Sequence, residues 1–257
     1  MLARLPACGA ALRRPRGARS ISRSVGAVGL ANVGKSSLFN ALVCSQDLAL
    51  VANYPFATID PSTAAVAVAD ERLDTLVTRC GSARAVPWQL ELVDIAGLIR
   101  GASAGAGLGN AFLSHIRAVH AIAHVMRCFD NDRVIHVETA PDPARDADIV
   151  ETELLLADLQ TVEKRLVALR SSKAGRAGGA QTEATVALLE AAQAALDAGR
   201  PARSLEPGLD SRQLPLWHGL QLLTQKPMLY VANVDEAGAM AWRDAVERAA
   251  GGARGAL

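Results

Sequence analysis

Short apolar runs alternate with amphipathic segments along most of the chain, which is the pattern of an alternating α/β domain. Strands are predicted over residues 25–29, 64–68, 88–93, 121–128 and 228–232. Helices are predicted over residues 36–43, 112–119 and 241–250. The stretch 101–109 has four glycines in nine residues, so it is predicted to be a loop.

The region over residues 148–215 has a different pattern. Apolar residues recur there at helical spacing, with Glu and Lys between them, at Leu154, Leu155, Leu159, Val162, Leu166 and Leu169. A glycine-rich tip at 171–180 and a second helical pattern follow, and residues 201–215 are predicted to be a polar connector. We therefore expect an antiparallel helical hairpin inserted into a domain formed by residues 25–147 and 216–257.

The first 24 residues differ in composition from the rest of the chain. They contain six arginines, and no acidic residue occurs before Asp47. An Arg-rich and Ser-rich leader without acids is typical of a mitochondrial or plastid transit peptide. The alternatives are a disordered basic tail on a cytoplasmic protein and a wrongly assigned start codon.

The remaining charges limit the classes of partner. The whole chain has a net charge of +1, but without the leader it has 21 basic and 26 acidic residues, a net charge of −5. Such a domain has no general electrostatic attraction to nucleic acid, and no sequence-specific nucleic-acid binding is expected; any contact with RNA would need a local basic patch. No apolar run reaches 18 residues, so no membrane span is predicted.

The strongest chemical signal is the segment from Gly29 to Ser36, which reads GLANVGKS and fits the P-loop pattern GxxxxGK[ST]. It follows a predicted strand and opens a predicted helix. The glycines let backbone N–H groups turn toward a phosphate, and the helix N-terminus adds positive potential. In this pattern Lys35 bridges the β- and γ-phosphates, and the Ser36 hydroxyl is a ligand of Mg²⁺.

Two further segments favour a nucleotide-dependent switch over a kinase. Asp94 to Gly97 follows an apolar strand and fits DxxG, in which the Asp holds a Mg²⁺-bound water and the Gly97 N–H senses a γ-phosphate. Between the two motifs, Thr58 lies in the loop NYPFATIDP, which could order over the metal. The predicted Mg²⁺ ligands are therefore Ser36, Thr58 and Asp94.

These residues resemble the YchF/Obg-like ATPase family, a branch of the translation-factor-related P-loop GTPases. The resemblance covers about residues 25–250, and the segments that carry it are GLANVGKSSLFNAL, NYPFATIDP, VDIAGLIRGASAGAGLGNAFLSHIR, ETELLLADLQTVEKRL and KPMLYVANVDE. It implies a P-loop NTPase fold, which is α/β and Rossmann-like with a mostly parallel sheet. It also implies ATP as the nucleotide, with GTP bound more weakly, and the ribosome as partner through the hairpin and its tip.

The resemblance bases the preference for ATP on the segment Asn233-Val-Asp-Glu236. Related GTPases have NKxD here, and the final Asp accepts two hydrogen bonds from guanine. Val234 and Glu236 replace the Lys and the Asp, which removes the lysine stem and moves the carboxylate. The predicted nucleotide contacts are Asn32, Val33, Gly34, Lys35, Ser36, Ser37, Asn233, Val234 and Glu236.

The residue after DxxG is Leu98, which cannot orient a water molecule, so unaided hydrolysis is expected to be slow. Family resemblance assigns that task to His136, with a purely structural histidine as the alternative. The predicted catalytic residues are His136, Lys35 and Gly97. Asn32 matches a P-loop Asn that holds K⁺ in some relatives, so K⁺ is a candidate second cofactor.

Some positions depart from the family pattern. Ala31 replaces a usual Pro and Ala106 a usual Glu. The sequence also ends before the last strand of the nucleotide-binding domain and the C-terminal TGS domain that family members have, so a fragment, a truncated gene product or an isoform is expected. Two alternative functions remain: a GTP-preferring switch of the same architecture, and a nucleotide-binding module that no longer hydrolyses.

Overall fold

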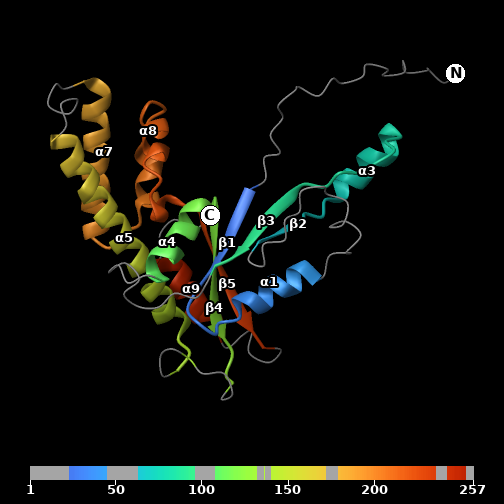
Figure 1. The fold of residues 1–257 in the computed structure, drawn as a ribbon. Coiled ribbons are helices and arrows are strands. Elements are labelled where there is room, and N and C mark those ends of the chain that lie inside the picture. The colour runs from blue at the N-terminus through green and yellow to red at the C-terminus, as the bar shows by residue number, and fades with distance from the viewer. Residues whose placement is uncertain are drawn as a thin grey trace.

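The computed structural model describes residues 23–44, 63–95, 108–131, 136, 140–171, 179–235 and 242–252. In this part of the chain a sheet with strand order β2-β3-β1-β4-β5 forms the centre of the molecule (Figure 1). Its strands are β1 (Arg23–Val28), β2 (Thr63–Ala67), β3 (Gln89–Asp94), β4 (Ala121–Cys128) and β5 (Met228–Val234). Every pairing is parallel except that of β2 with β3. The predicted α/β fold with a mostly parallel sheet is confirmed.

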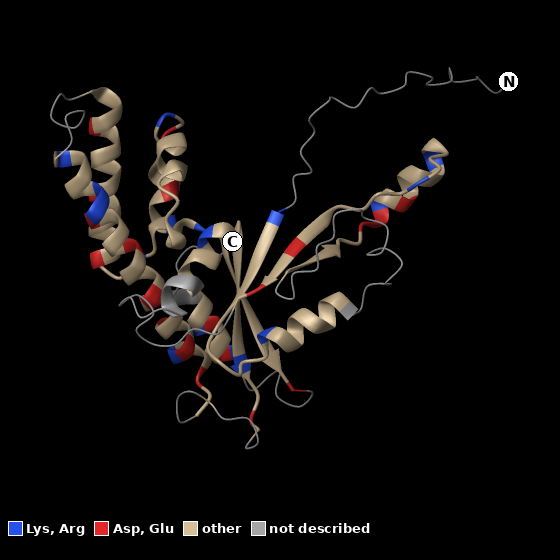
Figure 2. Ribbon diagram, in the orientation of Figure 1, with Lys and Arg blue, Asp and Glu red and all other residues tan. Residues whose placement is uncertain are grey.

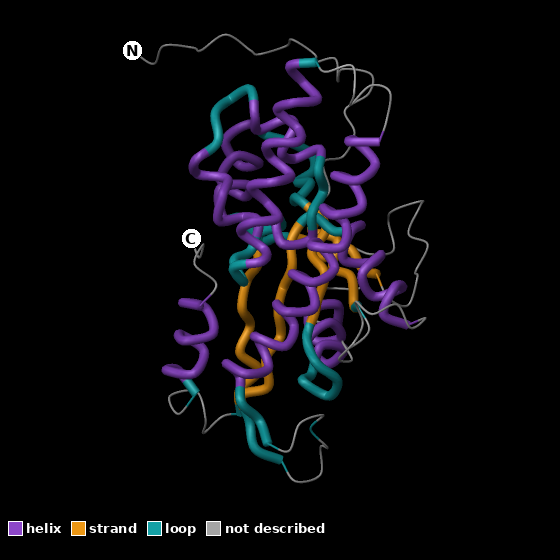
Figure 3. The backbone as a smooth tube through the Cα atoms, turned by 90° about the vertical axis from the view of Figure 1, so that its left-hand side faces the viewer, coloured by secondary structure: helices purple, strands orange, loops and turns teal. Residues whose placement is uncertain are grey.

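The helices α1 (Lys35–Cys44), α4 (Leu108–Ala118) and α9 (Arg243–Gly252) pack around this sheet. One core cluster joins α4 to β1 and β4 through residues such as Val28, Ile116 and Ile122. A second cluster, which includes Met126 and Ala249, joins β4 to α9. Figure 3 shows the strands enclosed between helices. Burial on both faces explains why β4 is an almost continuous apolar run.

β1 begins at Arg23, two residues before the predicted start. Ser24 is 4% exposed, and its backbone N–H donates to Nδ1 of His120. The folded domain therefore includes the last two residues of the predicted leader, and the other leader residues lie outside the described part of the chain.

One helix between β2 and β3 was not predicted. α3 (Glu71–Cys80) begins after Asp70, whose side chain accepts a hydrogen bond from the backbone N–H of Arg72, and ends at Gly81 in the left-handed conformation. It has no buried residue and projects from the sheet with the β2–β3 pair (Figure 1). The cap residues Asp70 and Gly81 are the sequence signal that could have identified it.

Two long helices, α5 (Pro143–Ser171) and α7 (Ala180–Asp197), form the hairpin. They are antiparallel, because Arg170 near the end of α5 pairs with Glu190 of α7, and Arg203, shortly after α7, pairs with Glu151 near the start of α5. Acidic and basic residues both occur along these helices (Figure 2). α5 begins five residues before the predicted boundary at 148. Among the described residues, no helix is long and apolar enough to cross a membrane.

The polar connector predicted over residues 201–215 has regular structure of its own. This region contains a 3₁₀ helix, η2 (Ala202–Gly208), and the start of α8 (Gln213–Gly219), and a second 3₁₀ helix, η3 (Leu223–Gln225), follows. Pro207 fits within η2, and Trp217 of α8 is fully buried against the hairpin core of Val162, Leu189 and Leu196. Scattered Pro and Gly concealed an apolar face that packs on the hairpin.

Asp158 joins the hairpin to the sheet domain. Its carboxylate, 1% exposed, accepts hydrogen bonds from the backbone N–H groups of Leu223 and Thr224 at 2.8 and 2.7 Å, and from the Thr224 hydroxyl at 2.7 Å. Burial raises the pKa of this carboxyl, and the three hydrogen bonds oppose that rise. This contact fixes the start of η3, and therefore the entry into β5, against α5.

Candidate functional site

The segment between β1 and α1 forms a tight loop whose backbone needs glycine at two positions. Gly29 has φ +153° and Gly34 has φ +97°. A Cβ on Gly29 would lie 2.3 Å from the backbone oxygen of Val125, so no side chain fits there. Asn32 also has a positive φ, of 62°. Alternating backbone conformations of this kind turn successive N–H groups toward one centre, which makes a cradle for an anion.

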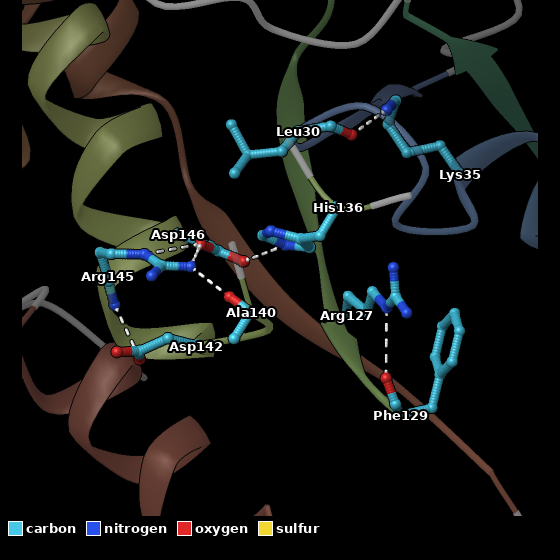
Figure 4. A network of polar contacts seen from close by, with 9 residues as sticks. All are labelled: Leu30, Lys35, Arg127, Phe129, His136, Ala140, Asp142, Arg145 and Asp146. Atoms are coloured by element: carbon cyan, nitrogen blue, oxygen red, sulfur yellow. Dashed lines mark hydrogen bonds and ion pairs between the residues drawn. The ribbon is translucent and has the colours of Figure 1, made fainter. Parts of the chain in front are cut away.

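Lys35, the first residue of α1, directs its ammonium group back into this loop. Its Nζ donates hydrogen bonds to the carbonyl oxygens of Leu30 at 2.7 Å and Gly29 at 3.2 Å, and the residue is 7% exposed (Figure 4). Burial lowers the pKa of Lys35, and the nearby charge of Asp94 opposes that effect. Among the described residues, the hydrogen bonds of this buried cation go to loop carbonyls, and a cation held in this way can transfer them to the oxygens of a phosphate.

Ser36 and Asp94 lie next to each other at the same edge of the sheet. The Ser36 hydroxyl donates to Oδ2 of Asp94 at 2.6 Å. Asp94 ends β3, which pairs with β1 in parallel, with Ala27 opposite Asp94. Hydroxyl and carboxylate oxygens are ligands that suit Mg²⁺, so these two side chains fit a magnesium ion that a phosphate would complete. Thr58 and Gly97 lie outside the described residues.

The end of β5 is attached to the same loop. Nδ2 of Asn233 donates to the backbone oxygen of Val33 at 2.9 Å, although the two residues are 200 positions apart. A Cβ on Gly34 would lie 2.2 Å from this Nδ2, so the contact requires glycine there. Val234, the last residue of β5, is 39% exposed beside it. The structure thus brings the P-loop and the Asn233 segment together, and Glu236 lies outside the described residues.

The other predicted contacts of the nucleotide are also near the loop. Asn32 is exposed at the apex of the loop, and Ser37 is exposed in the first turn of α1. Val33 is 1% exposed and packs into the core that supports the loop. In the predicted set, therefore, the Val33 side chain is not accessible to a ligand, whereas the side chains of Asn32, Ser36 and Ser37 are.

His136 lies in a buried ionic network at the start of α5. Its Nε2 is 2.9 Å from Oδ2 of Asp146, and the two side chains are 4% and 2% exposed. Arg145 bonds the other carboxylate oxygen of Asp146 at 3.0 Å. Figure 4 shows the imidazole directed toward Asp146 and away from Lys35. In this conformation the geometry agrees with the structural alternative, and the catalytic role of His136 stays a prediction.

His124, which the sequence places in a buried strand and gives no further role, lies under the P-loop. It is 1% exposed, and burial, together with the charge of Lys35, lowers its pKa to about 4. Its ring packs against Tyr230 of β5, with centroids 5.5 Å apart, and the Tyr230 hydroxyl donates to Glu151 at 2.8 Å. His120, four residues earlier, has a different partner, because its Nδ1 accepts a hydrogen bond from the backbone N–H of Ser24. No local pattern within the strand segment AIAHVMRC distinguishes His124 from a core residue.

Sequence reasoning missed Arg127. It lies at the carboxyl end of β4, opposite Asn233 in the register of β4 and β5, and is 2% exposed. Its guanidinium lies over the ring of Phe129, 4.6 Å from the centroid, and donates to the carbonyl oxygen of Phe129 at 3.2 Å (Figure 4). It also donates to the carbonyl oxygen of Asn131 at 3.0 Å. These bonds fix the chain as it leaves the edge of the sheet that carries the P-loop.

The chain is similar to known proteins over most of its length. Residues 24–166 match the family model described as 50S ribosome-binding GTPase. The ribosome-binding ATPase YchF of Bacillus subtilis is 46% identical over 213 residues, which is 83% of this chain and 57% of that protein. Obg-like ATPase 1 of Schizosaccharomyces pombe is 44% identical over 215 residues, or 82% of this chain and 54% of the relative.

A solved structure supports the same relationship. The YchF GTPase of Schizosaccharomyces pombe aligns with a TM-score of 0.73 and 40% identity, over 89% of this chain and 62% of that one. The chain therefore spans little more than half the length of the curated relatives it matches.

Proposed function

Because this chain belongs to the 50S ribosome-binding GTPase family and, within it, to the YchF/Obg-like branch, we propose that it binds ATP with Mg²⁺ at the P-loop and hydrolyses it slowly. The observation that carries the proposal is the position of Lys35. Its ammonium is buried at the centre of a loop with three positive-φ residues, 2.7 Å from a loop carbonyl. A phosphate group is the ligand that such a cradle fits.

Ser36, Thr58 and Asp94 are the proposed Mg²⁺ ligands. When bound, the ion neutralises charge on the phosphates. The support in the described residues is the 2.6 Å contact between Ser36 and Asp94, which places two oxygen donors side by side at the mouth of the loop. The Gly97 N–H is proposed to sense the γ-phosphate, in keeping with its place in DxxG.

We propose that the base is read at the end of β5 by Asn233, Val234 and Glu236. The hydrogen bond from Asn233 to Val33 holds this segment against the phosphate loop. Val234 offers an apolar side chain where a lysine would be needed for the guanine-binding motif, so ATP is preferred over GTP. Membership of the 50S ribosome-binding GTPase family favours the alternative of a GTP-preferring switch.

Competition for one fluorescent nucleotide separates these two functions. Increasing ATP or GTP displaces a fluorescent ADP analogue from the purified chain in magnesium buffer. The proposal expects displacement at a lower concentration of ATP than of GTP. Equal potency, or tighter GTP binding, contradicts the assignment of ATP and supports the alternative.

Hydrolysis is proposed to be slow because Leu98 replaces a residue that could orient water. His136 is the proposed replacement, and it would have to leave its contact with Asp146 to act. Phosphate release by the chain and by its His136→Gln variant tests this role. Nucleotide binding without any phosphate release would instead support a non-hydrolysing module.

Phosphate release measured in K⁺ and in Na⁺ buffer tests the proposed K⁺ contact of Asn32, and equal rates would exclude it.

The ribosome is the proposed partner, since the relatives are named as ribosome-binding proteins. The hairpin of α5 and α7 is the proposed contact. Cosedimentation with purified ribosomes tests this, with residues 172–178 replaced by a short Gly-Ser linker in the variant. The proposal expects the variant to remain in the supernatant, while unchanged pelleting of the variant excludes the tip.

We also propose that residues 1–22 direct the chain to a mitochondrion or plastid. Their arginine content and lack of acidic residues support this address. A fluorescent protein fused behind these residues should localise to the organelle, and diffuse cytoplasmic fluorescence would favour the alternative of a basic tail.

A further inference from the structure

A cavity of about 480 Å³ lies at the opposite edge of the sheet from the P-loop. The end of α4 and the turn into β4 form one wall, and α8, η3 and Pro227 form the others. The P-loop follows the carboxyl end of β1, whereas this cavity adjoins the residues that precede the parallel strands β4 and β5. The hairpin extends beyond the sheet at this same end (Figure 1). The polar residues of its lining include Arg117, His120, Glu206, His218, Gln221 and Lys226.

The electrostatic balance of this lining is positive. Arg117 and Lys226 are cations, and Glu206 is the acidic residue among those that line the cavity. His218 lies 3.9 Å from a Glu206 oxygen, so it faces that carboxylate charge. Without its leader the chain has a net charge of −5, so a lining with two cations and one carboxylate is a local exception, and the buried Asp158 carboxylate behind it interacts with both cations. The cavity is therefore the kind of local basic patch that an anionic ligand would need.

Arg117 is the main donor available in the cavity. It interacts electrostatically with Asp158, but that carboxylate already accepts three hydrogen bonds from Leu223 and Thr224. The Arg117 guanidinium makes no hydrogen bond or ion pair with another residue of the described part of the chain. Its planar fork of N–H groups matches the geometry of phosphate oxygens.

His120 is oriented by its contact with β1. The backbone N–H of Ser24 donates to Nδ1 of His120 at 3.1 Å, so Nδ1 acts as the acceptor and the ring proton is on Nε2. The Ser24 hydroxyl lies 2.8 Å from the same nitrogen. His120 is exposed, while Ser24 is buried. The imidazole thus offers an N–H donor from a fixed position on the cavity wall.

The Lys226 ammonium is held by two backbone carbonyls at the end of α4. Its Nζ donates to the carbonyl oxygens of Arg117 and Val119, which fixes the ammonium beside the end of α4 and leaves one N–H for a ligand.

Gln221, at the turn after α8, has a positive φ of 50°, a conformation that is uncommon for a residue with a side chain. Its backbone N–H bonds the carbonyl of His218, which sustains this turn at the cavity.

From this arrangement we propose that the cavity binds a phosphate group, supplied by a phosphorylated small molecule or by the backbone of RNA. Arg117, Lys226 and the Nε2–H of His120 are its donors, and His218 adds a further one. The site is separate from the P-loop, so it does not depend on the proposed ATPase activity.

The test uses the full chain with the substitution Lys35→Ala, which removes phosphate binding at the P-loop. One probe is radiolabelled pyrophosphate, measured by equilibrium dialysis, and the other is a fluorescein-labelled ten-nucleotide oligouridylate, measured by anisotropy. Arg117→Gln removes the main donor. Arg79→Gln, on the projecting helix α3, is the control that removes the same charge from an exposed position elsewhere.

Hydrogen bonds between charged groups predict that Arg117→Gln weakens binding about tenfold or more, while Arg79→Gln changes it less than about twofold. Loss of pyrophosphate binding identifies a small-molecule phosphate site, and loss of oligouridylate binding alone identifies an RNA backbone. The proposal is overturned if neither probe binds the Lys35→Ala chain, or if Arg117→Gln and Arg79→Gln bind equally.

A second variant keeps the test decisive if Arg117→Gln unfolds. His218→Gln changes a side chain that is 60% exposed, so it should not affect folding. Comparable thermal unfolding midpoints establish that a variant is folded. A several-fold loss of binding in folded His218→Gln supports the proposal, and unchanged binding by that variant overturns it.

Discussion

Substitution of Gly34 by alanine tests how the P-loop and β5 depend on each other. Gly34 has φ +97°, and its missing side chain leaves room for the Asn233 amide that bonds Val33. An alanine Cβ would lie 2.2 Å from Nδ2 of Asn233. The substitution therefore both strains the backbone and displaces the amide from its acceptor.

The two effects can be estimated separately. A positive φ of this kind costs a residue with a Cβ about 1–3 kcal/mol. Loss of the Asn233 hydrogen bond adds about 1 kcal/mol. We expect Gly34→Ala to lower the free energy of unfolding by about 2–4 kcal/mol. ATP affinity should fall as well, because a distorted loop no longer directs its N–H groups toward the phosphates.

Urea unfolding and calorimetric ATP titration measure these two quantities. Gly81→Ala is the matched control, since Gly81 has φ +61° but nothing lies within 4 Å of the position a Cβ would occupy. It should show only the backbone effect on stability and no change in ATP affinity. In Gly34→Ala combined with Asn233→Ala, the clash is absent, so stability should recover in part relative to Gly34→Ala alone.

The reasoning is refuted if Gly34→Ala loses no more stability than Gly81→Ala and binds ATP like the unaltered chain. That result would mean that the contact of Asn233 with Val33 neither shapes the loop nor limits the residue at position 34.

Three further predictions concern buried side chains. The pKa of His124 is lowered from 6.5 to about 4, so folding favours its neutral form. This contributes about 3 kcal/mol to the free energy of unfolding, which is complete above pH 6.5 and is lost as the pH falls toward 4. The stability of His124→Leu should therefore depend much less on acid pH, and an unchanged pH profile would contradict the assignment. Asp158→Ala leaves three buried donors without their acceptor and should lower the free energy of unfolding by about 3–5 kcal/mol in urea titrations. Asp74→Ala on exposed α3 should have little effect, and similar losses in both variants would contradict a stabilising role of the Asp158 contact. Trp217→Ala should lower the free energy of unfolding by about 3–5 kcal/mol, because Trp217 is fully buried. The control is Trp88→Ala, since Trp88 is 46% exposed, and unfolding of both variants at the same urea concentration would contradict the packing of α8.

Features that depend on nearby residues could be predicted from the sequence. The P-loop is recognisable because Gly29, Gly34 and Lys35 must have fixed spacing to wrap a phosphate, and the structure has Lys35 directed into that loop. The strands were recognisable because each is a short run rich in apolar residues, and β1 and β4 are largely buried between helices. The hairpin was recognisable because its apolar residues recur over many turns.

Features that depend on distant contacts could not be predicted. The bond between Asn233 and Val33 joins residues 200 positions apart, and no local pattern reports it. The environment of His124 depends on Lys35 and Tyr230, which lie on other elements. α8 was missed because Trp217 is buried by α7 and α5, so its segment shows an apolar face only in the folded chain. α3 is the exception, because its caps at Asp70 and Gly81 were local and could have been recognised.

The central claim is that the P-loop backbone and the Lys35 ammonium hold the phosphates of ATP. Calorimetric titration of ATP with Mg²⁺ into the chain and into its Lys35→Ala variant tests it most directly. Loss of hydrogen bonds between the ammonium and phosphate oxygens predicts an affinity at least about 100-fold lower for the variant, with similar thermal unfolding of both proteins. Equal ATP affinity of the two folded proteins would contradict the account.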